Sequence, residues 1–272
     1  MRTDSEQFYQ EFASSRPPFA TMYHRRKAMA HATRGPRFRW YYFFNELERI
    51  HRRQAIDSLL EVSAGNGVNL ALAHEQLGIA RCLATDVMPR PGDMPAFIDY
   101  ARLEVTSLGE WLPAGSVSAV LMIEVLEHVW DPDEAIEAVY RVLRPGGHLI
   151  LTTPNLSSLV NRIALVLGYQ PLGSEVSTRR TFGNPGPRQV AGHLRIFTYR
   201  ALKEFLRHYG FQVERAYSAA LGGGLAYESA ISPARGLGPS RLARWVVKVD
   251  ALASRFGPSW GTDCIFVLRK PG

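Results

Sequence analysis

Short apolar runs alternate with amphipathic stretches along most of the chain, which is the pattern of repeated strand and helix units. The pattern predicts strands at Leu59–Val62, Ile79–Thr85, Phe97–Val105, Ser118–Ile123, His148–Thr152, Phe211–Tyr217 and Cys264–Leu268. It predicts helices at Trp40–Arg53, Val68–Leu77, Asp131–Leu143, Asn155–Leu167 and Tyr199–Tyr209. Strands that alternate with helices form a mostly parallel sheet with helices on both faces, so the predicted fold class is α/β with a doubly wound sheet.

Glycine, proline and acidic residues mark where several of these elements begin and end. Asp131 and Pro132 are followed by two acids, which is typical of the first turn of a helix. Gly78 predicts the end of one helix, and Arg144-Pro145-Gly146-Gly147 predicts a turn that stops another. The bounds of these helices are therefore supported by capping and turn residues as well as by hydrophobic spacing.

Residues 1–56 are predicted to form a basic and helical arm ahead of the main domain, with the boundary near Asp57. Between His24 and Arg39 the arm carries six lysines and arginines, no acid and several aromatic residues. Such a segment is either a solvated face or a surface that holds a phosphate-bearing acceptor.

Residues 57–272 are predicted to form the main domain, with a lid insertion at about 155–197. Between Gly168 and Gly192 the insertion carries several glycines and prolines together with arginines. A loop of this length inside a regular domain is often functional, so we expect substrate contacts here.

The composition is that of a globular protein, with 46% hydrophobic and 21% charged residues and no apolar run long enough to cross a membrane. The N-terminal residues lack the apolar core of a secretory signal, so we expect a cytoplasmic protein. Cys82 and Cys264 lie in apolar runs and are expected to be buried thiols. The net charge of +7 would suit nucleic acid or lipid, but the basic residues are mostly arginine, which we interpret first as a genomic base-composition effect.

A glycine turn follows the first predicted strand, in the segment Glu61-Val62-Ser63-Ala64-Gly65-Asn66-Gly67. Small residues let the backbone approach a ligand closely, and the next helix offers the positive end of its dipole. Asp86 ends the next strand roughly 20 residues later, where a carboxylate can bind both ribose hydroxyls of a nucleoside. The alternative is that the glycines only form a tight turn and that Asp86 only caps it.

Further segments raise the specificity of this pattern, namely Glu124-Val125-Leu126-Glu127-His128-Val129, Asp131-Pro132, Leu143-Arg144-Pro145-Gly146-Gly147-His148-Leu149 and Thr152-Thr153-Pro154-Asn155. In combination they resemble the class I S-adenosylmethionine-dependent methyltransferases, over about residues 58–217. The branch they resemble most includes ubiquinone-pathway O-methyltransferases and enzymes that modify bacterial polysaccharides. The resemblance implies a seven-stranded Rossmann-like sheet and S-adenosylmethionine as the cofactor.

The resemblance also implies roles for individual positions in cofactor binding. It places the methionine part of the cofactor beside Glu61, Ser63, Gly65 and Gly67, the ribose on Asp86, the adenine on Glu104 and Val105, and the ring or sulfonium on Ile123. Ser63 departs from the family pattern because glycine is usual there, and Ser118 departs because the fourth strand often starts with Asp. Serine is small enough to keep the turn, so we expect binding to survive.

Methyl transfer to a hydroxyl needs a group that removes its proton, and His128 is the best candidate because its ordinary pKa is about 6.5. The alternative is that His128 packs under the following helix and caps a carbonyl. Glu124, Glu127 and His128 have helical spacing and, with His193, could bind Mg²⁺ or Mn²⁺. This set of two Glu and two His resembles that of small-RNA 2′-O-methyltransferases. The expected catalytic residues are therefore His128, Glu127 and His193.

The expected function is O-methylation of a hydroxylated small molecule or saccharide. RNA 2′-O-methylation is an alternative that the basic arm favours, but the chain carries no recognised RNA-binding module, so nucleic acid ranks behind a small acceptor. A second alternative is a non-catalytic, methyltransferase-like binding subunit. Ser240–Phe256 is predicted to be an amphipathic helix that packs on the domain or makes peripheral contact with an anionic membrane.

Overall fold

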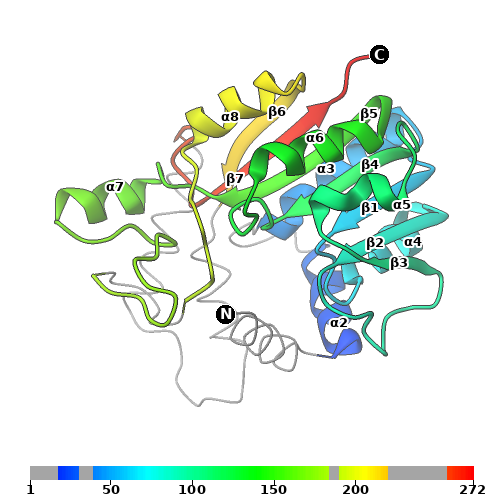
Figure 1. The fold of residues 1–272 in the computed structure, drawn as a ribbon, viewed down its shortest axis with the longest axis horizontal. Coiled ribbons are helices and arrows are strands. Elements are labelled where there is room, and N and C mark those ends of the chain that lie inside the picture. The colour runs from blue at the N-terminus through cyan, green and yellow to red at the C-terminus, as the bar shows by residue number, and fades with distance from the viewer. Residues whose placement is uncertain (1–17, 31–38, 184–189, 220–255) are drawn as a thin grey trace.

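A computed structural model describes residues 18–30, 39–183, 190–219 and 256–272 (Figure 1). A seven-stranded sheet runs through it in the order β3-β2-β1-β4-β5-β7-β6. The strands are β1 (Ser58–Val62), β2 (Arg81–Asp86), β3 (Ile98–Arg102), β4 (Val117–Ile123), β5 (Leu143–Pro154), β6 (Gln212–Ala219) and β7 (Asp263–Arg269). Only the contacts of β7 with β5 and β6 are antiparallel, so the predicted mostly parallel α/β sheet is confirmed.

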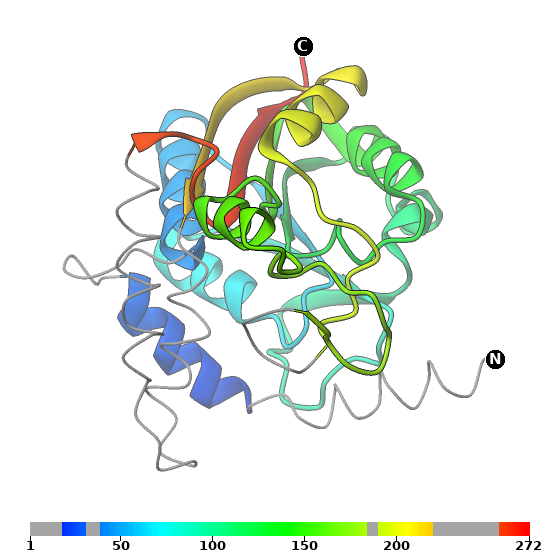
Figure 2. The same cartoon turned by 90° about the vertical axis from the view of Figure 1, so that its left-hand side faces the viewer.

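Helices cover both faces of the sheet, as Figure 2 shows nearly edge-on. They are α2 (Phe19–Ala30), α3 (Arg39–Arg53), α4 (Val68–Leu77), α5 (Leu108–Trp111), α6 (Pro132–Val142), α7 (Leu159–Val166) and α8 (Tyr199–His208), with a 3₁₀ turn at Val105–Ser107. One apolar cluster packs α5, α6 and α8 against the sheet, and the other packs α3 and α4 on the opposite face. The sheet is therefore buried on both sides, which explains why its central strands are almost uninterrupted apolar runs.

Three predicted elements differ from the structure. The predicted strand Phe97–Val105 ends at Arg102, because Val105 and Leu108 turn into the core at helical spacing and start the 3₁₀ turn and α5. The predicted helix Asn155–Leu167 begins only at Leu159, where the hydroxyl of Ser158 caps it by accepting from Asn161 N. The side-chain amide of Asn155 donates to the backbone carbonyls of Ser259 and Gly261.

The predicted turn at Arg144–Gly147 stops α6 but lies inside the bounds of β5. The pairing of β5 with β4 shifts here, from Val117 opposite Leu143 to Ala119 opposite His148. Gly147 is required at this bulge, because a Cβ atom would lie 2.9 Å from the carbonyl of Arg144 and 3.0 Å from that of Ser118.

The N-terminal arm shares its apolar core with the main sheet. Phe43, Leu47 and Ile50 of α3 are buried in the same cluster as β1 and α4. Glu46 of α3 is also buried, and it accepts from Arg49 and from Tyr217 of β6. The domain boundary near residue 57 stays a prediction.

Among the described residues, the two cysteines are buried free thiols as predicted, and no helix is long and apolar enough to cross a membrane. The predicted helix Ser240–Phe256 lies outside the described residues apart from Phe256. Membrane contact through that helix therefore stays a prediction.

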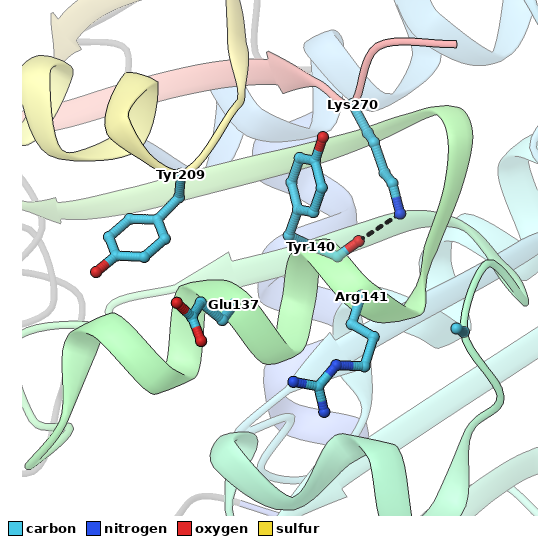
Figure 3. A pocket seen from close by; sticks show the side chains of 6 residues that line it. Glu137, Tyr140, Arg141, Tyr209 and Lys270 are labelled. Carbon is cyan, nitrogen blue, oxygen red and sulfur yellow. Dashed lines mark hydrogen bonds between the residues drawn. The ribbon is translucent and has the colours of Figure 1, made fainter.

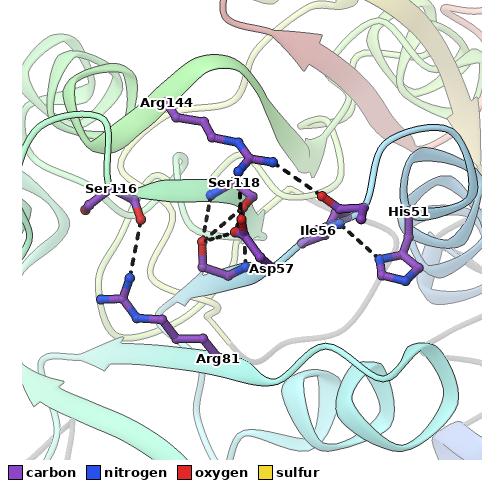
Figure 4. Close-up of polar contacts among 9 residues, drawn as sticks. His51, Ile56, Asp57, Arg81, Ser116, Ser118 and Arg144 are labelled. Atoms are coloured by element: carbon purple, nitrogen blue, oxygen red, sulfur yellow. Dashed lines mark hydrogen bonds and ion pairs between the residues drawn. The ribbon is translucent and has the colours of Figure 1, made fainter.

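Ser118 sits in a polar cluster at the start of β4 and β1, in which the two serines are buried and Asp57 is exposed (Figure 4). Its amide donates to the hydroxyl of Ser58 at 3.0 Å, and the amide of Ser58 donates to the hydroxyl of Ser118 at 3.3 Å. The carboxylate of Asp57 accepts from both hydroxyls and pairs with Arg144 at 2.8 Å. Ser118 therefore binds the carboxylate of Asp57 at the start of β4.

The hydrogen bond from Ser118, together with those from Ser58 and Arg144, lowers the pKa of Asp57 below its ordinary 3.8. We expect Ser118→Ala to lower the free energy of unfolding by about 1–3 kcal/mol, because the amide of Ser58 loses a buried acceptor. A further part of the loss comes from the hydrogen bond between Ser118 and Asp57. Because the Asp57 pKa is lowered on folding, that part is present above the ordinary value and is lost as the pH falls through the folded value. Urea unfolding at pH 7 and below pH 4 measures both effects.

The matched control is Ser116→Ala, because the buried hydroxyl of Ser116 has no hydrogen-bond partner among the described residues. That variant should change stability by less than about 0.5 kcal/mol. Equal losses in the two variants, or a loss at Ser118 that is independent of pH, would contradict the role of the cluster.

Candidate active site

The turn between β1 and α4 is built from three left-handed residues. Ser63, Gly65 and Gly67 have φ angles of 53°, 59° and 74°. The positive φ favours glycine at Gly67, and a Cβ atom there would also push the end of the Ile98 side chain, 2.8 Å away, whereas Ser63 adopts a left-handed conformation at some cost in strain. The turn brings the backbone to the carboxyl edge of the sheet at the N-terminus of α4, where helix amides and dipole favour an anionic or polar ligand.

Asp86 joins this turn to the next one. Its Oδ2 accepts from the amide of Gly65 at 3.0 Å and its Oδ1 accepts from the amide of Met88 at 3.1 Å. The side chain is 4% exposed. Asp86 therefore does cap the turns, and it also stands at the edge where β1 and β2 end side by side.

Glu61 lies one residue before the end of β1 and is buried. Burial raises its pKa to about 7, against the opposing effects of a hydrogen bond from Asn69 and the charge of Arg26. Its Oε2 atom has no hydrogen-bond partner within the described part of the chain. A buried carboxylate oxygen in this state favours a cationic ligand group.

The other predicted cofactor residues lie along the same edge. Ile123 is the last residue of β4, and the residue before it, Met122, pairs with Val62 at the end of β1. Glu104 and Val105 follow β3, where the amide of Leu103 donates to the carbonyl of Asp86 at 3.1 Å. The structure thus brings the predicted set together at the ends of four neighbouring strands, and the roles of the individual residues stay predictions.

Three of the four predicted metal ligands come together. One ligand atom from each of Glu127, His128 and His193 lies within 4.8 Å of the others. Residues 124–128 form a turn and not a helix, and Glu124 has a φ of 55°. Its carboxylate accepts from Thr152 at 2.7 Å, which leaves Glu124 outside this group.

The segment around His193 reaches the site from the predicted lid. Leu194 and Arg195 donate their amides to the carbonyl of Glu127 at 2.9 and 3.3 Å. The guanidinium of Arg195 binds the carbonyls of Val129 and Trp130. His193 of the insertion thus lies beside Glu127 and His128, and the expectation that the insertion contacts the substrate stays a prediction.

Hydrogen bonds to backbone carbonyls orient both imidazoles. His128 Nδ1 lies 3.0 Å from the carbonyl of Gly192, and His193 Nδ1 lies 2.8 Å from that of Gly173. A carbonyl only accepts, so each Nδ1 carries the proton and each Nε2 keeps its lone pair. His128 Nε2 lies 3.8 Å from Oε1 of Glu127. The Glu127 side chain is fully buried, and its Oε2 accepts from the hydroxyl of Thr153 at 2.9 Å.

Burial lowers the pKa of His128, and the neighbouring His193 lowers it further. The carbonyl of Gly192 and the charges of Glu124 and Glu175 act in the opposite direction. The net shift of the His128 pKa is downward, which favours the neutral imidazole. A neutral imidazole is the form that accepts a proton or binds a metal ion.

Glu175 is a residue that the sequence pattern did not reveal as part of the site. Its carboxylate accepts from the backbone amides of Ala191, Gly192 and His193, the last two at 2.9 and 3.2 Å. It therefore fixes the carbonyl of Gly192 that orients His128. One signal was available, since Glu175 is the only acidic residue between Glu137 and Glu204.

A surface hollow on α6 lies away from this site (Figure 3). Its lining includes Glu137, Tyr140, Arg141, Tyr209 and Lys270, none of which belongs to the predicted set. The ammonium of Lys270 donates to the carbonyls of Tyr140 and Leu143 at 2.8 and 2.7 Å. A cation at the C-terminus of α6 stabilises the end of the helix, so this hollow has a structural explanation.

A family model described as a methyltransferase domain matches residues 24–216. The chain therefore belongs to the methyltransferase-domain family. The resemblance to S-adenosylmethionine-dependent methyltransferases, inferred from the glycine turn and the later segments, is confirmed at this level.

Two curated relatives illustrate how far the likeness extends. A Mycolicibacterium smegmatis protein named a "probable S-adenosylmethionine-dependent methyltransferase" is 31% identical over 186 residues, which cover 66% of this chain and 61% of the relative. The ubiquinone biosynthesis O-methyltransferase of Dechloromonas aromatica is 31% identical over 96 residues, or 35% of this chain and 38% of that enzyme. The chain thus spans less than two thirds of the length of each.

Solved structures share the fold at lower identity. The complex between the Haloferax volcanii Trm112 methyltransferase activator and a methyltransferase contains a chain with a TM-score of 0.53 and 15% identity, covering 95% of this chain and all of that one. The [4+2]-cyclase SpnF superposes on this chain with a TM-score of 0.52 at 20% identity, and the match covers 88% of this chain and 86% of the cyclase. These likenesses establish the fold.

We expect Glu175→Gln to loosen the segment 191–193, because an amide has one carbonyl oxygen where the carboxylate has two acceptors and a charge. Amide hydrogen exchange at Gly192 and His193 should become faster, and the imidazole nitrogen signals of His128 should show loss of a single tautomer by NMR. The matched control is Glu204→Gln on the exposed face of α8, which should leave both signals unchanged. Unaltered exchange and tautomer in Glu175→Gln would contradict the positioning role.

Proposed function

We propose that this protein binds S-adenosylmethionine at the carboxyl edge of β1, β2 and β4 and transfers its methyl group to a hydroxyl of a small molecule or saccharide. The observation that carries the proposal is the meeting of two sites at one sheet edge. The glycine turn with Asp86 follows β1 and β2, and the Glu127, His128 and His193 group follows the adjacent strand β4. Ligands of doubly wound folds bind at this edge.

The cofactor residues follow from the positions that the family pattern assigns. Asp86 would bind the ribose hydroxyls, and the turn at Ser63, Gly65 and Gly67, with Glu61, would surround the amino-acid end. Glu104 and Val105 would face the adenine, and Ile123 would contact the ring or the sulfonium. The burial of Asp86 and Glu61 supports these roles, because charge-assisted hydrogen bonds are stronger where water is excluded.

The chemistry requires little beyond orientation and removal of one proton. The sulfonium is already a strong electrophile, so the protein has to hold the acceptor oxygen in line with the methyl group. His128 would accept the proton of the acceptor hydroxyl through Nε2, whose lone pair is exposed by the Nδ1 contact with Gly192. Glu127 would stabilise the imidazolium that forms, since its carboxylate lies 3.8 Å away.

The same group fits a divalent cation. A buried carboxylate and two imidazoles whose other nitrogens are bound to carbonyls are a common donor set for metals. Glu127, His128 and His193 would hold Mg²⁺ or Mn²⁺, which would supply a Lewis acid that lowers the pKa of the acceptor hydroxyl. Glu124 would join them only after leaving Thr152.

Two alternatives remain. RNA 2′-O-methylation was favoured by the basic arm, but Arg26 and Lys27 of that arm bind Asn69 and Glu75 of α4, which favours a small acceptor. A non-catalytic or differently catalytic role is the second, since the [4+2]-cyclase SpnF shares the fold and fold alone does not fix chemistry.

The decisive experiment measures methyl transfer from labelled S-adenosylmethionine to panels of catechols, phenols, saccharides and short RNAs, with His128→Ala as the control. Labelled product from a phenol, catechol or saccharide that disappears in the variant supports the proposal. Product from RNA alone would favour the first alternative. Cofactor binding without transfer to any acceptor would favour the second.

We expect Asp86→Ala to weaken binding of S-adenosylhomocysteine at least tenfold, because hydrogen bonds to a charged group contribute about 1.5–3 kcal/mol each. Isothermal titration calorimetry measures the affinity, and a thermal unfolding scan checks that the turns remain folded. The control is Asp99→Ala, which removes an exposed carboxylate on the neighbouring strand β3. Unchanged affinity in Asp86→Ala would contradict the assignment.

We expect excess chelator to abolish turnover and added Mg²⁺ or Mn²⁺ to restore it if the cation is required. Calorimetric titration of Mn²⁺ should show a site that His193→Ala removes. Full activity in chelator, with no Mn²⁺ site, would leave His128 as a metal-independent base.

A further inference from the structure

Helix α7 opens the insertion and carries a polar side chain on the face that it buries. Figure 1 shows α7 projecting from the main body. Its buried residues are Asn161 and Ala164, whereas Leu165 and Val166 are 55% and 86% exposed. Because alanine buries little apolar surface, the position of α7 depends on directional polar contacts.

Asn161 binds both backbone groups of Leu172, in the loop that follows the helix. Its Oδ1 accepts from the amide of Leu172 at 2.7 Å, and its Nδ2 donates to the carbonyl of Leu172 at 3.3 Å. Nδ2 also donates to the carbonyl of Asn155 at 3.1 Å. The side chain is 3% exposed and uses its donor and its acceptor, so the backbone at Leu172 is fixed in position and in orientation.

The residue after Leu172 is Gly173, whose carbonyl orients the imidazole of His193. His193 Nδ1 donates to this carbonyl at 2.8 Å. Gly173 has a φ of 82°, and an added Cβ atom would lie 3.4 Å from His193 Nδ1 and 3.2 Å from Ile196. The glycine backbone therefore lies directly against the ring, and Asn161 holds the peptide that leads into it.

The two imidazoles of the site are oriented through different parts of the insertion. The ring of His128 is oriented by the segment whose amides Glu175 binds. The ring of His193 is oriented by the segment that Asn161 binds. Glu175 also accepts from the backbone amide of His193, so a change at Asn161 is the more selective of the two.

We propose that Asn161 is a positioning residue of the active site. It fixes the carbonyl of Gly173, which keeps the proton of His193 on Nδ1 and leaves Nε2 as the acceptor nitrogen, beside Glu127 and His128. The inference rests on the proposed methyl transfer, in which His193 belongs to the catalytic group. Asn161 acts through the backbone of the insertion and does not itself touch that group.

Two observations favour positioning over a role in stabilising α7 alone. The helix has a separate cap, because the hydroxyl of Ser158 accepts from the backbone amide of Asn161 at 3.3 Å. A buried amide adds little net stability, since it gives up equivalent hydrogen bonds to water, but a satisfied one makes its surroundings rigid. The direction of its hydrogen bonds is therefore the main effect of Asn161.

NMR signals of the imidazole nitrogens, recorded on the full chain, separate the two roles. Asn161→Leu keeps a similar size and loses the side-chain hydrogen bonds with Leu172 and Asn155. Asn161→Asp is a milder second variant, because it keeps the acceptor and loses the donor. Ser158→Ala is the matched control, because it removes the cap of the same helix and leaves the side-chain contacts with Leu172 in place.

We expect both Asn161 variants to give His193 a second tautomer, with the proton on Nε2, whereas Ser158→Ala keeps a single one. His128 should keep its signals in all three variants, because its ring binds a different carbonyl. Turnover should fall about tenfold or more in the Asn161 variants, as when the partner that orients a metal-bound histidine is lost. Affinity for S-adenosylhomocysteine should change by less than about twofold, because these variants leave the glycine turn and Asp86 unaltered.

A single tautomer of His193 in both Asn161 variants would overturn the inference, and so would an equal change in Ser158→Ala. An altered tautomer with unaltered turnover would overturn the positioning role. If the unaltered chain transfers a methyl group to no acceptor, the proposed function fails, and the NMR signals still decide whether Asn161 orients His193. The outcomes therefore distinguish an error about Asn161 from an error about the reaction.

Discussion

The carboxylate of Asp86 is the contact on which the proposed site depends. It holds the amide of Gly65 in one turn and that of Met88 in the next, so two strand ends keep a fixed separation. Three left-handed residues at alternate positions are unfavourable in an isolated chain, and a charge-assisted hydrogen bond offsets part of that cost. Any ligand at the edge of β1 and β2 meets a backbone that is already arranged before it arrives.

Much of the fold could be predicted because local and long-range signals agree. Residues 68–77 have helical spacing, follow a glycine turn and end at Gly78, whose φ is 71°, so periodicity and capping place the helix at the same bounds. Beyond Arg102 the two signals separate. An apolar residue such as Val105 continues the strand pattern, but Val105 and Leu108 both pack in the buried cluster with residues of distant strands and helices, and those tertiary contacts cannot be predicted from a strand pattern.

Part of the site could be predicted from the sequence, and part of it could not. Motif positions locate Asp86 and the glycine turn, because strand ends of a parallel sheet must meet at one edge. Helical spacing would place Glu124 with Glu127 and His128, but the left-handed backbone at Glu124 turns its carboxylate toward Thr152. Glu175 acts across a loop, through hydrogen bonds to the backbone amides of residues 191–193, and no local pattern carries that information.

The antiparallel strand β7 has a consequence for the order in which the protein is made. It lies between β5 and β6 and is synthesised after both, so β6 has no neighbour in the sheet until residues 263–269 leave the ribosome. The same strand covers the edge of β5 next to Thr153, the residue that donates to Glu127. During translation β5 therefore presents an open edge until β7 has been made, and an open strand edge is a place where another chain can pair.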